Sequence, residues 1–394
     1  MLIGLVGKPS CGKSTFFKAC TLADVLIAAY PFATIKPNQG VAYVKIDCID
    51  KELGVQCNPR TGYCVNGVRF VPVDIMDVAG LVEGASKGKG LGNQFLNNLT
   101  DADAFIHIVD VSGETDAEGK ETKDYNPVQD VKMLENELDL WYLGILSKVW
   151  KGFARTLQNT KANFAESIAK QFSGLKVKED DVKRVLLNGD YNIEKPASWA
   201  EDELKRFAHD LRHLTKPMII AANKMDRVNS EENLKKLKCA YPGIMIVGCS
   251  ADSELALREA KNHDLIEYLP GENKFEIDES KVNEKQKAVL EIIQKNVLDK
   301  YGSTGVQEVL NKVVFDLLKY IAIFPAGSKL ADSKGNILPD CFLLPEGSTA
   351  LDFAYHLHSD IGDNFVKAIN VRTKLAVGKE HVLKHRDGLE IMTR

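Results

Sequence analysis

The chain has 394 residues, of which 44% are hydrophobic and 27% are charged, which is typical of a folded globular protein and excludes intrinsic disorder. Its 51 Lys and Arg residues and 55 Asp and Glu residues give a formal net charge of −4, which excludes a strongly basic nucleic-acid coat protein. No apolar run reaches the ~18 residues that a membrane helix needs, and the eight cysteines include no Cys-x-x-Cys pair. We therefore expect two or three domains, a cytoplasmic location, no membrane partner and no disulfide framework.

The first expected strand, Leu2–Val6, runs into residues 7–14, which fit the pattern G-x-x-x-x-G-K-S of a phosphate-binding loop. The glycines let successive backbone N–H groups point at one anion, and the N-terminus of the following helix adds partial positive charge. Lys13 would contact the β- and γ-phosphates, and the Ser14 hydroxyl would bind Mg²⁺. A chance glycine-rich turn is the alternative, which the preceding strand and following helix disfavour. The expected nucleotide contacts here are Gly7, Lys8, Pro9, Ser10, Cys11, Gly12, Lys13, Ser14 and Thr15.

The next expected strands are 41–46 and 70–76. The first alternates in polarity and is expected as an edge strand beside Leu2–Val6, whereas Pro72 weakens the prediction for the start of the second. Asp77 and Gly80 follow this strand in the pattern D-x-x-G. Asp77 would hold Mg²⁺ directly or through water, and the N–H group of Gly80 would reach the γ-phosphate. Such a pattern alone is often a simple turn, and its position after the phosphate loop favours the nucleotide site.

The interval between the expected strands 105–111 and 218–222 is far longer than the ~30 residues of a strand–helix–strand crossover. Most of it must therefore be an insertion. Apolar residues recur there every three or four positions, which predicts helices over 127–149, from 153 to 172 and over 204–214. The insertion would be a hairpin packed on itself or, given its slight excess of basic residues, a surface that binds ribosome or RNA.

The strand 218–222 leads into the sequence Asn-Lys-Met-Asp at 223–226. The Asp226 carboxylate can accept hydrogen bonds from the N1–H and N2 amino groups of guanine, whereas adenine would leave it unpaired. Lys224 can lie along the base, and Asn223 can connect this loop to the phosphate loop. Asp226 could also have the structural role of a helix N-cap, which does not exclude base recognition.

The last expected strand of this series, 244–247, is followed by Ser250 and Ala251, whose backbone N–H groups would contact the guanine O6 atom. Four motifs therefore follow one another along the chain, each at the carboxyl end of a strand, where open α/β sheets bind ligands. Together they predict a site for GTP and GDP.

The remaining chain is expected to form a helical stretch and a small mixed module. Residues 280–319 are helical in pattern, with a break at 302–305. Beyond residue 327, strands at 341–344 and 365–371 flank one expected helix at 349–361.

Three segments resemble known families. Residues 30–38 and 80–96 resemble the Obg-like GTPases, and the second segment is most similar to their YchF branch. Residues 342–354 resemble a TGS domain, a ubiquitin-like β-grasp fold that also occurs in threonyl-tRNA synthetases and stringent-response enzymes. The resemblance implies that Thr34 ligates Mg²⁺ and senses the γ-phosphate. It also places Leu81 where many small GTPases have a water-positioning glutamine, which implies slow hydrolysis that depends on another group, a cation or a partner.

The resemblance leaves the cation and the nucleotide open. Many Obg-like proteins have Asn at the position of Ser10, which implies a K⁺ site, whereas the developmentally regulated GTP-binding branch has Ser there. Many YchF-type members have an altered base motif and prefer ATP, whereas residues 223–226 have the guanine form. We therefore expect the protein to bind GTP. The alternatives are a YchF-type ATPase and an RNA- or ribosome-binding module with negligible turnover.

The predicted fold is an α/β P-loop NTPase domain (G domain) at 1–125 and 216–275, interrupted by an inserted helical domain at 126–215. A helical extension at 276–320 would pack on the G domain, and 321–394 would form the β-grasp TGS domain. The predicted function is slow GTP hydrolysis by a translation- or ribosome-associated switch that binds the ribosome or RNA through its helical and TGS domains. The expected catalytic residues are Lys13, Thr34 and Gly80, and the expected Mg²⁺ ligands are Ser14, Thr34 and Asp77.

Three further cysteines, Cys48, Cys57 and Cys64, lie between the expected strands 41–46 and 70–76. A metal site would need a fourth ligand, and none lies nearby at a familiar spacing. We expect structural thiols, with a Cys57–Cys64 disulfide as the alternative.

Overall fold

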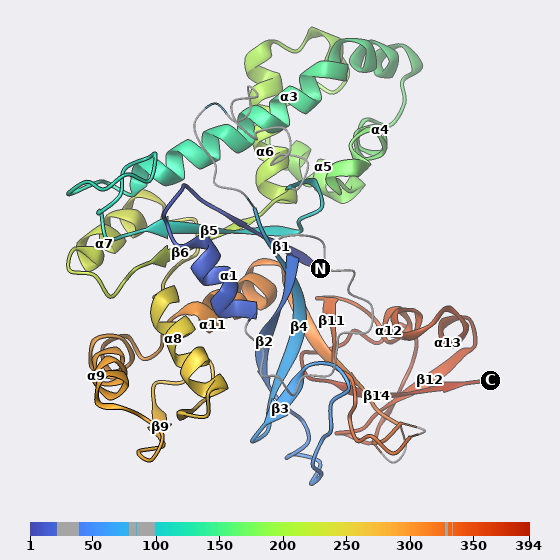
Figure 1. The fold of residues 1–394 in the computed structure, drawn as a ribbon. Helices are drawn as coiled ribbons and strands as arrows, with labels where there is room; N and C mark the ends of the chain where they lie inside the picture. The colour runs from blue at the N-terminus through green and yellow to red at the C-terminus, as the bar shows by residue number, and fades with distance from the viewer. Residues whose placement is uncertain (22–38, 79–83, 85–98, 328–329, 333) are drawn as a thin grey trace. The chain divides into compact units, whose positions relative to one another are not determined.

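The computed structural model describes residues 1–21, 39–78, 84, 99–327, 330–332 and 334–394 (Figure 1). Contacts divide the chain into two compact units. The first consists of Met1–Ala19, Pro37–Gly40 and Asp74–Val309, and the second of Cys20–Lys36, Val41–Val73 and Leu310–Arg394. Among the described residues, no helix combines the length and hydropathy that crossing a membrane requires.

A parallel sheet forms the centre of the first unit. Its strands, in spatial order, are the end of β4 (Val68–Asp77), β1 (Leu2–Val6), β5 (Ala104–Asp110), β6 (Met218–Asn223) and β7 (Ile246–Gly248). All seven residues of β5 are buried, as expected for a central parallel strand. The predicted strands are confirmed, and β4 continues through Pro72.

The prediction that the strand at 41–46 lies beside β1 is wrong. β1 pairs with β4 and β5, whereas β2 (Gln39–Asp47) follows β4 in the strand order. Alternating polarity indicates how a strand is buried but contains no information about which strand pairs with it.

The insertion is helical, as predicted, but its first helix ends later in the chain than predicted. α3 (Val128–Thr160) continues through Gly152, and the residue that follows it, Lys161, has a left-handed φ of 51°. An internal glycine costs a helix only about 1 kcal/mol relative to alanine, which packing along a long helix can offset. The next helix, α4 (Phe164–Gln171), starts where the Asn163 side chain accepts the N–H of Glu166 at 3.2 Å. The other helices of the insertion are α5 (Glu179–Asn188) and α6 (Glu201–Thr215).

Aromatic side chains hold the insertion together. The Trp150 and Trp199 ring centroids are 5.0 Å apart, and Phe207 lies 5.3 Å from Trp199. These residues belong to one buried cluster that also contains Val6 and Phe105 from the sheet. The insertion therefore shares the core of the first unit, and the prediction of a hairpin packed only on itself is wrong.

His107 in β5 predicts a pH-dependent stability. The residue is buried, and its Nδ1 atom has no hydrogen-bond partner among the described residues. Burial lowers the pKa of His107 from 6.5 to about 3. Between these values the unfolded chain binds a proton that the folded chain does not, so acidification favours unfolding. We expect the free energy of unfolding to fall by about 2 kcal/mol from pH 7.5 to pH 5 through this residue.

Urea unfolding of the His107→Leu variant at both pH values would measure this contribution. The variant should lose about 2 kcal/mol less than the wild-type chain over this interval, in which most carboxylates stay ionised. Equal losses in the two proteins would show that His107 is not buried in its neutral form.

The rest of the first unit consists mainly of helices. An antiparallel pair of strands that the sequence did not predict, β8 (Ile266–Tyr268) and β9 (Phe275–Ile277), lies among them. The predicted break at 302–305 is confirmed. The helices are α1 (Lys13–Thr21), α7 (Ser230–Ala240), α8 (Ala251–Asn262), α9 (Glu284–Ile293), the π-helix Gln294–Leu298, α10 (Asp299–Tyr301) and α11 (Val306–Asn311). The last two residues of α1 and of α11, and the following π-helix Lys312–Leu317, belong to the second unit.

The second unit contains the β-grasp module. Its five strands have the spatial order β11-β10-β14-β12-β13, in which only β10 and β14 pair in parallel. The predicted single helix at 349–361 is two helices, because the extended backbone of His358 separates α12 (Ala350–Leu357) from α13 (Ser359–Asp363). The strands are β10 (Tyr320–Pro325), β11 (Phe342–Pro345), β12 (Phe365–Asn370), β13 (Ala376–Val377) and β14 (Gly388–Thr393).

An antiparallel hairpin completes the second unit. β3 (Tyr63–Val65) pairs with the start of β4 across a turn at Asn66 and Gly67, which both have positive φ. The long segment between β2 and β3 contains Cys48 and Cys57 and forms no regular helix or strand.

Candidate nucleotide-binding site

The phosphate loop, residues 7–14, connects β1 to α1 and packs closely on its surroundings. Gly7 and Gly12 have φ values of 152° and 93°. A Cβ atom added at Gly7 would lie 2.5 Å from the Ile108 carbonyl oxygen. A Cβ atom added at Gly12 would lie 2.3 Å from Asn223 Nδ2. Only glycine fits both positions, so the pattern reflects a steric requirement of the loop.

Lys13 and Ser14 open α1, directly after this loop. The Lys13 ammonium group donates to the Lys8 carbonyl oxygen at 3.0 Å. The Ser14 hydroxyl donates to Asp77 Oδ2 at 2.9 Å, at the end of β4. A hydroxyl and a carboxylate thus lie side by side next to an anion-binding loop, and these are the oxygen ligands that Mg²⁺ prefers. The two predicted ligands therefore fit the metal.

The Lys8 side chain is anchored inside the protein. Its Nζ atom lies 2.9 Å from Asp130 Oδ2, and each side chain is only 1% exposed. The same ammonium group donates to the Thr115 carbonyl oxygen at 2.7 Å and lies 4.1 Å from the centre of the Tyr125 ring. Because this charge is already paired, Lys8 has only its backbone left for the predicted phosphate contact. Asp130, at the start of α3, is a supporting residue that the sequence motifs did not reveal.

Asn223 links the two ends of the site. Its Nδ2 atom donates to the Cys11 carbonyl oxygen in the phosphate loop at 2.9 Å, as predicted. Its Oδ1 atom accepts the N–H of Ala251 at 3.0 Å. The N–H of Ser250 donates to the Thr304 carbonyl oxygen at 2.8 Å. Both of these N–H groups therefore already have partners within the chain, and their contact with guanine O6 stays a prediction.

Lys224 is positioned by a buried carboxylate. It has a left-handed φ of 64°, and its Nζ atom lies 2.6 Å from Asp110 Oδ2. Asp110 also accepts the hydroxyls of Ser112 at 2.6 Å and Thr115 at 2.7 Å. Burial raises the pKa of Asp110, but these hydrogen bonds and the charge of Lys224 outweigh it and lower the pKa. An acidic residue at the end of β5 was the only sequence signal for Asp110.

Asp226 presents a carboxylate to solvent. Its side chain is 25% exposed, and Oδ2 lies 3.6 Å from Nε of the neighbouring Arg227. The expected helix N-cap at Asp226 is wrong, because α7 starts at Ser230 with Asn229 at the N-cap position. Asp226 thus stands in a turn just after β6, where its carboxylate has no helix to cap.

A buried network supports the loop that carries Ser250. Glu254 in α8 is fully buried and accepts the Thr304 hydroxyl at 2.5 Å and the Tyr268 hydroxyl at 2.8 Å. Arg258 Nε donates to its other oxygen at 2.6 Å. The sequence did not identify Glu254, since its partners are up to 50 residues away.

The predicted switch residues Thr34, Gly80 and Leu81 lie outside the described residues. Of the predicted site, the structure therefore describes the phosphate loop, Asp77 and the two base-side loops. It brings these together at the carboxyl ends of β1, β4, β6 and β7.

Three family models match the chain. Residues 2–137 match a model described as 50S ribosome-binding GTPase, and residues 221–327 match the G4 motif-containing domain of YGR210-like Obg-like GTPases. Residues 321–393 match the TGS domain.

Relatives match along the whole length. An uncharacterized GTP-binding protein of Methanocaldococcus jannaschii is 48% identical over 395 residues, which cover 100% of this chain and 99% of that protein. The ribosome-binding ATPase YchF of Bacillus subtilis is 30% identical over 385 residues, with coverage of 93% and 87%. The crystal structure of a GTP-binding protein from Pyrococcus horikoshii superposes with a TM-score of 0.81 at 40% identity and covers both chains completely. The chain therefore belongs to the Obg-like family of P-loop GTP-binding proteins, in its YchF-related branch, and carries a C-terminal TGS domain.

Proposed function

We propose that the protein binds GTP with Mg²⁺ and hydrolyses it to GDP and phosphate as a ribosome-associated switch. One observation carries the proposal: the hydrogen bond from Asn223 Nδ2 to the Cys11 carbonyl oxygen at 2.9 Å. It joins the base motif to the phosphate loop, so both ends of a nucleotide would be bound in a defined relation. The guanine form of the base motif and the accessible Asp226 carboxylate support GTP over ATP.

The residues of the chain would act mainly through positioning and charge. The Lys13 ammonium group would leave the Lys8 carbonyl oxygen for the β- and γ-phosphates, where it stabilises the charge that develops on the transferred group. The backbone N–H groups of residues 7–14 would hold the phosphate oxygens. Ser14 and Asp77, with Thr34, would bind Mg²⁺, which when bound supplies further positive charge. Water would attack the γ-phosphorus in line with the bond that breaks to release GDP.

The switch would depend on groups that respond to the γ-phosphate. Thr34 and the N–H of Gly80 would order their loops while this phosphate is present and release them after hydrolysis. Leu81 has no polar group to orient water, so turnover of the isolated protein should be slow. The ribosome is the proposed partner because the matching GTPase model and the Bacillus subtilis relative are both described as ribosome-binding. The helical insertion and the TGS domain would form the binding surfaces.

Multiple-turnover hydrolysis of GTP and ATP, with and without ribosomes, tests the proposal. We expect slow GTP hydrolysis by the protein alone, a higher rate with ribosomes, and loss of the rate in the Lys13→Ala variant by at least about 100-fold. Each assay is run in Na⁺ and in K⁺ buffer, since a K⁺ ion bound beside Ser10 would raise the rate only in K⁺.

Two outcomes would favour the alternatives. Faster hydrolysis and tighter binding of ATP would indicate an ATPase, the activity for which the Bacillus subtilis relative is named. Tight GTP binding without turnover under any of these conditions would indicate a module that the nucleotide only orders.

A further inference from the structure

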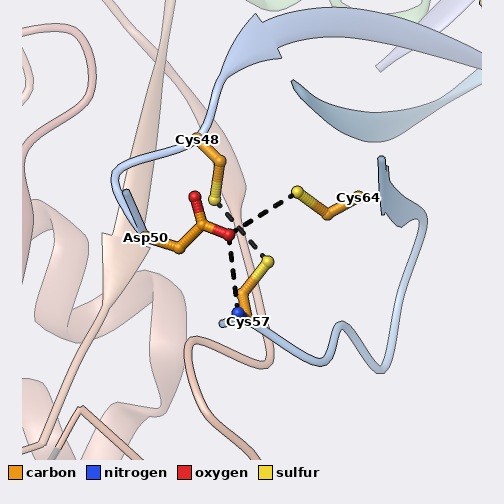
Figure 2. Close-up of side chains that lie close together, drawn as sticks. All are labelled: Cys48, Asp50, Cys57 and Cys64. Carbon is orange, nitrogen blue, oxygen red and sulfur yellow. Dashed lines mark hydrogen bonds between the residues drawn. The ribbon is translucent and has the colours of Figure 1, made fainter. Parts of the chain in front are cut away.

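Four potential metal ligands converge in the second unit. Cys48 follows β2, Cys64 lies in β3, and Asp50 and Cys57 belong to the segment between these strands. Figure 2 shows their side chains pointing toward one another. The three Sγ atoms and one carboxylate oxygen all lie within 4.8 Å of one another. Asp50 thus supplies a fourth potential ligand, which the cysteine spacing alone did not reveal.

The distances fit a tetrahedral metal site better than a disulfide. Zn–S bonds of about 2.3 Å and Zn–O bonds of about 2.0 Å place neighbouring ligand atoms about 3.5 to 3.8 Å apart in a tetrahedral site. The Cys48 and Cys57 Sγ atoms are 3.7 Å apart, and Cys64 Sγ lies 3.9 Å from Asp50 Oδ2. A disulfide requires about 2.05 Å, and all eight cysteines are free thiols. The alternative of a Cys57–Cys64 disulfide is therefore wrong for this structure.

The burial of Asp50 is an independent observation that favours a cation site. Its side chain is 1% exposed, and among the described residues no Lys or Arg side chain forms an ion pair with it. A buried carboxylate is costly unless it is paired or coordinates a metal. Its Oδ1 atom accepts the N–H of Lys51 at 2.7 Å, which directs Oδ2 towards the thiols. Such orientation of a ligand by a second hydrogen bond is common in metal sites.

The surroundings hold the ligands in place without a metal. The Cys48 N–H donates to the Gly67 carbonyl oxygen at 2.8 Å, which fixes the end of β2 against the β3–β4 turn. The fully buried Arg69, opposite Cys64 in the hairpin, donates to the Leu338 and Pro339 carbonyl oxygens at 3.1 and 3.0 Å. The segment between Cys48 and Cys64 lacks regular structure for most of its length, so a metal would cross-link an irregular loop.

We propose that Cys48, Asp50, Cys57 and Cys64 form a structural Zn²⁺ site. Four protein ligands leave no open position, which is typical of structural zinc, and thiolates favour Zn²⁺ over Mg²⁺ or Ca²⁺. The three thiols lose their protons to solvent as the ion binds.

A second cluster of potential metal ligands among the described residues does not compete with this assignment. Asp139, His209 and His213 also lie close together, on α3 and α6. However, the buried Arg212 guanidinium is already in their midst, with an ion pair to Asp139 Oδ1 at 2.8 Å. A second cation there would be repelled by this charge.

Metal content and cobalt spectroscopy on the full chain test the site. Elemental analysis of the purified protein should give about one zinc ion per chain. Titration of the metal-depleted wild-type chain with Co²⁺ should give thiolate-to-cobalt charge transfer in the near ultraviolet and the strong visible bands of tetrahedral Co²⁺. Removal of the metal should lower the melting temperature, because the folded chain holds all four ligands together and therefore binds the ion more tightly than the unfolded chain.

Variants identify the ligands. Cys57→Ser and Asp50→Asn should each weaken Zn²⁺ binding at least about 10-fold. Cys239→Ser, at an exposed cysteine in α7, and Cys341→Ser, at a buried cysteine outside the cluster, are the matched controls and should bind Zn²⁺ like the wild type. Circular dichroism of each variant shows whether it is folded, and the wild-type titration remains decisive if Cys57→Ser is not.

Three results would overturn the assignment. The first is a wild-type chain that takes up neither Zn²⁺ nor Co²⁺ under reducing conditions. The second is a disulfide between two of the three cysteines, found by mass spectrometry of the unreduced protein together with no metal. The third is a normal Zn²⁺ affinity of Asp50→Asn together with a loss of Zn²⁺ affinity in Cys341→Ser. This result would show that the fourth ligand is the Cys341 thiolate and not the Asp50 carboxylate.

Discussion

The Asp226→Asn variant is expected to bind GTP at least about 100-fold more weakly than the wild-type protein and to gain affinity for xanthosine triphosphate. The Asp226 carboxylate would accept two hydrogen bonds from guanine, and hydrogen bonds to a charged group contribute about 1.5–3 kcal/mol each. The asparagine amide replaces one acceptor by a donor, which faces the guanine amino group. Xanthine has a carbonyl oxygen in place of this amino group, so its pairing with the amide is restored.

Equilibrium titration with fluorescent GTP and competition by xanthosine and adenosine triphosphates would measure this exchange. Asp252→Asn, at an exposed residue in the first turn of α8, is the matched control and should leave all three affinities unchanged. If Asp226→Asn bound GTP as tightly as the wild-type protein, this carboxylate would not be the group that recognises the base. Tighter binding of adenosine triphosphate by the wild type would overturn the proposed GTP preference itself.

The Lys8→Met variant is expected to lose about 3–5 kcal/mol of unfolding free energy. The methionine side chain has a similar length but leaves the Asp130 carboxylate, which is 1% exposed, without its cation. Burial already raises the pKa of Asp130 against the opposing charge of Lys8, so without Lys8 this carboxyl group should take up a proton more readily. The loss of stability should therefore be smaller at low pH than at neutral pH.

Urea unfolding of a double-mutant cycle would separate the ion pair from other effects. Asp130→Asn should restore part of the stability of Lys8→Met, because it removes the unpaired charge, so the two changes should not be additive. Lys18→Met, at an exposed lysine in α1, should change stability by no more than about 0.5 kcal/mol. Additive effects, or a stable Lys8→Met single variant, would contradict a buried ion pair beneath the phosphate loop.

Long-range packing explains where the sequence predictions failed. Periodicity predicted that the insertion is helical but missed α5, and it placed a break at Gly152. It could not weigh a small glycine penalty against the packing of Trp150 with Trp199. Polarity alternation identified β2 but not its neighbour. In the phosphate loop, the motif placed Lys8 at the nucleotide, and its side chain instead pairs with Asp130, 122 positions further along the chain.

The cysteine cluster shows the same limit at a candidate metal site. The spacing of Cys48, Cys57 and Cys64 matches no familiar pattern, and Asp50 is an unremarkable residue in the sequence. It becomes a candidate ligand only because the chain between β2 and β3 folds back on the hairpin and brings its carboxylate to the thiols.

By itself, the sequence determined the phosphate loop, the base motif, the order of the strands that carry them along the chain, and the family with its TGS domain. These features depend on consecutive residues, since a glycine at positive φ or a carboxylate after a strand is required wherever that local backbone occurs. Only the tertiary structure decided that Lys8 is anchored by Asp130, that Asp110 holds Lys224 and that Asp50 joins three thiols. Such pairs depend on which segments the topology brings within a few ångströms of one another. The number of residues between two positions in the sequence does not determine that distance.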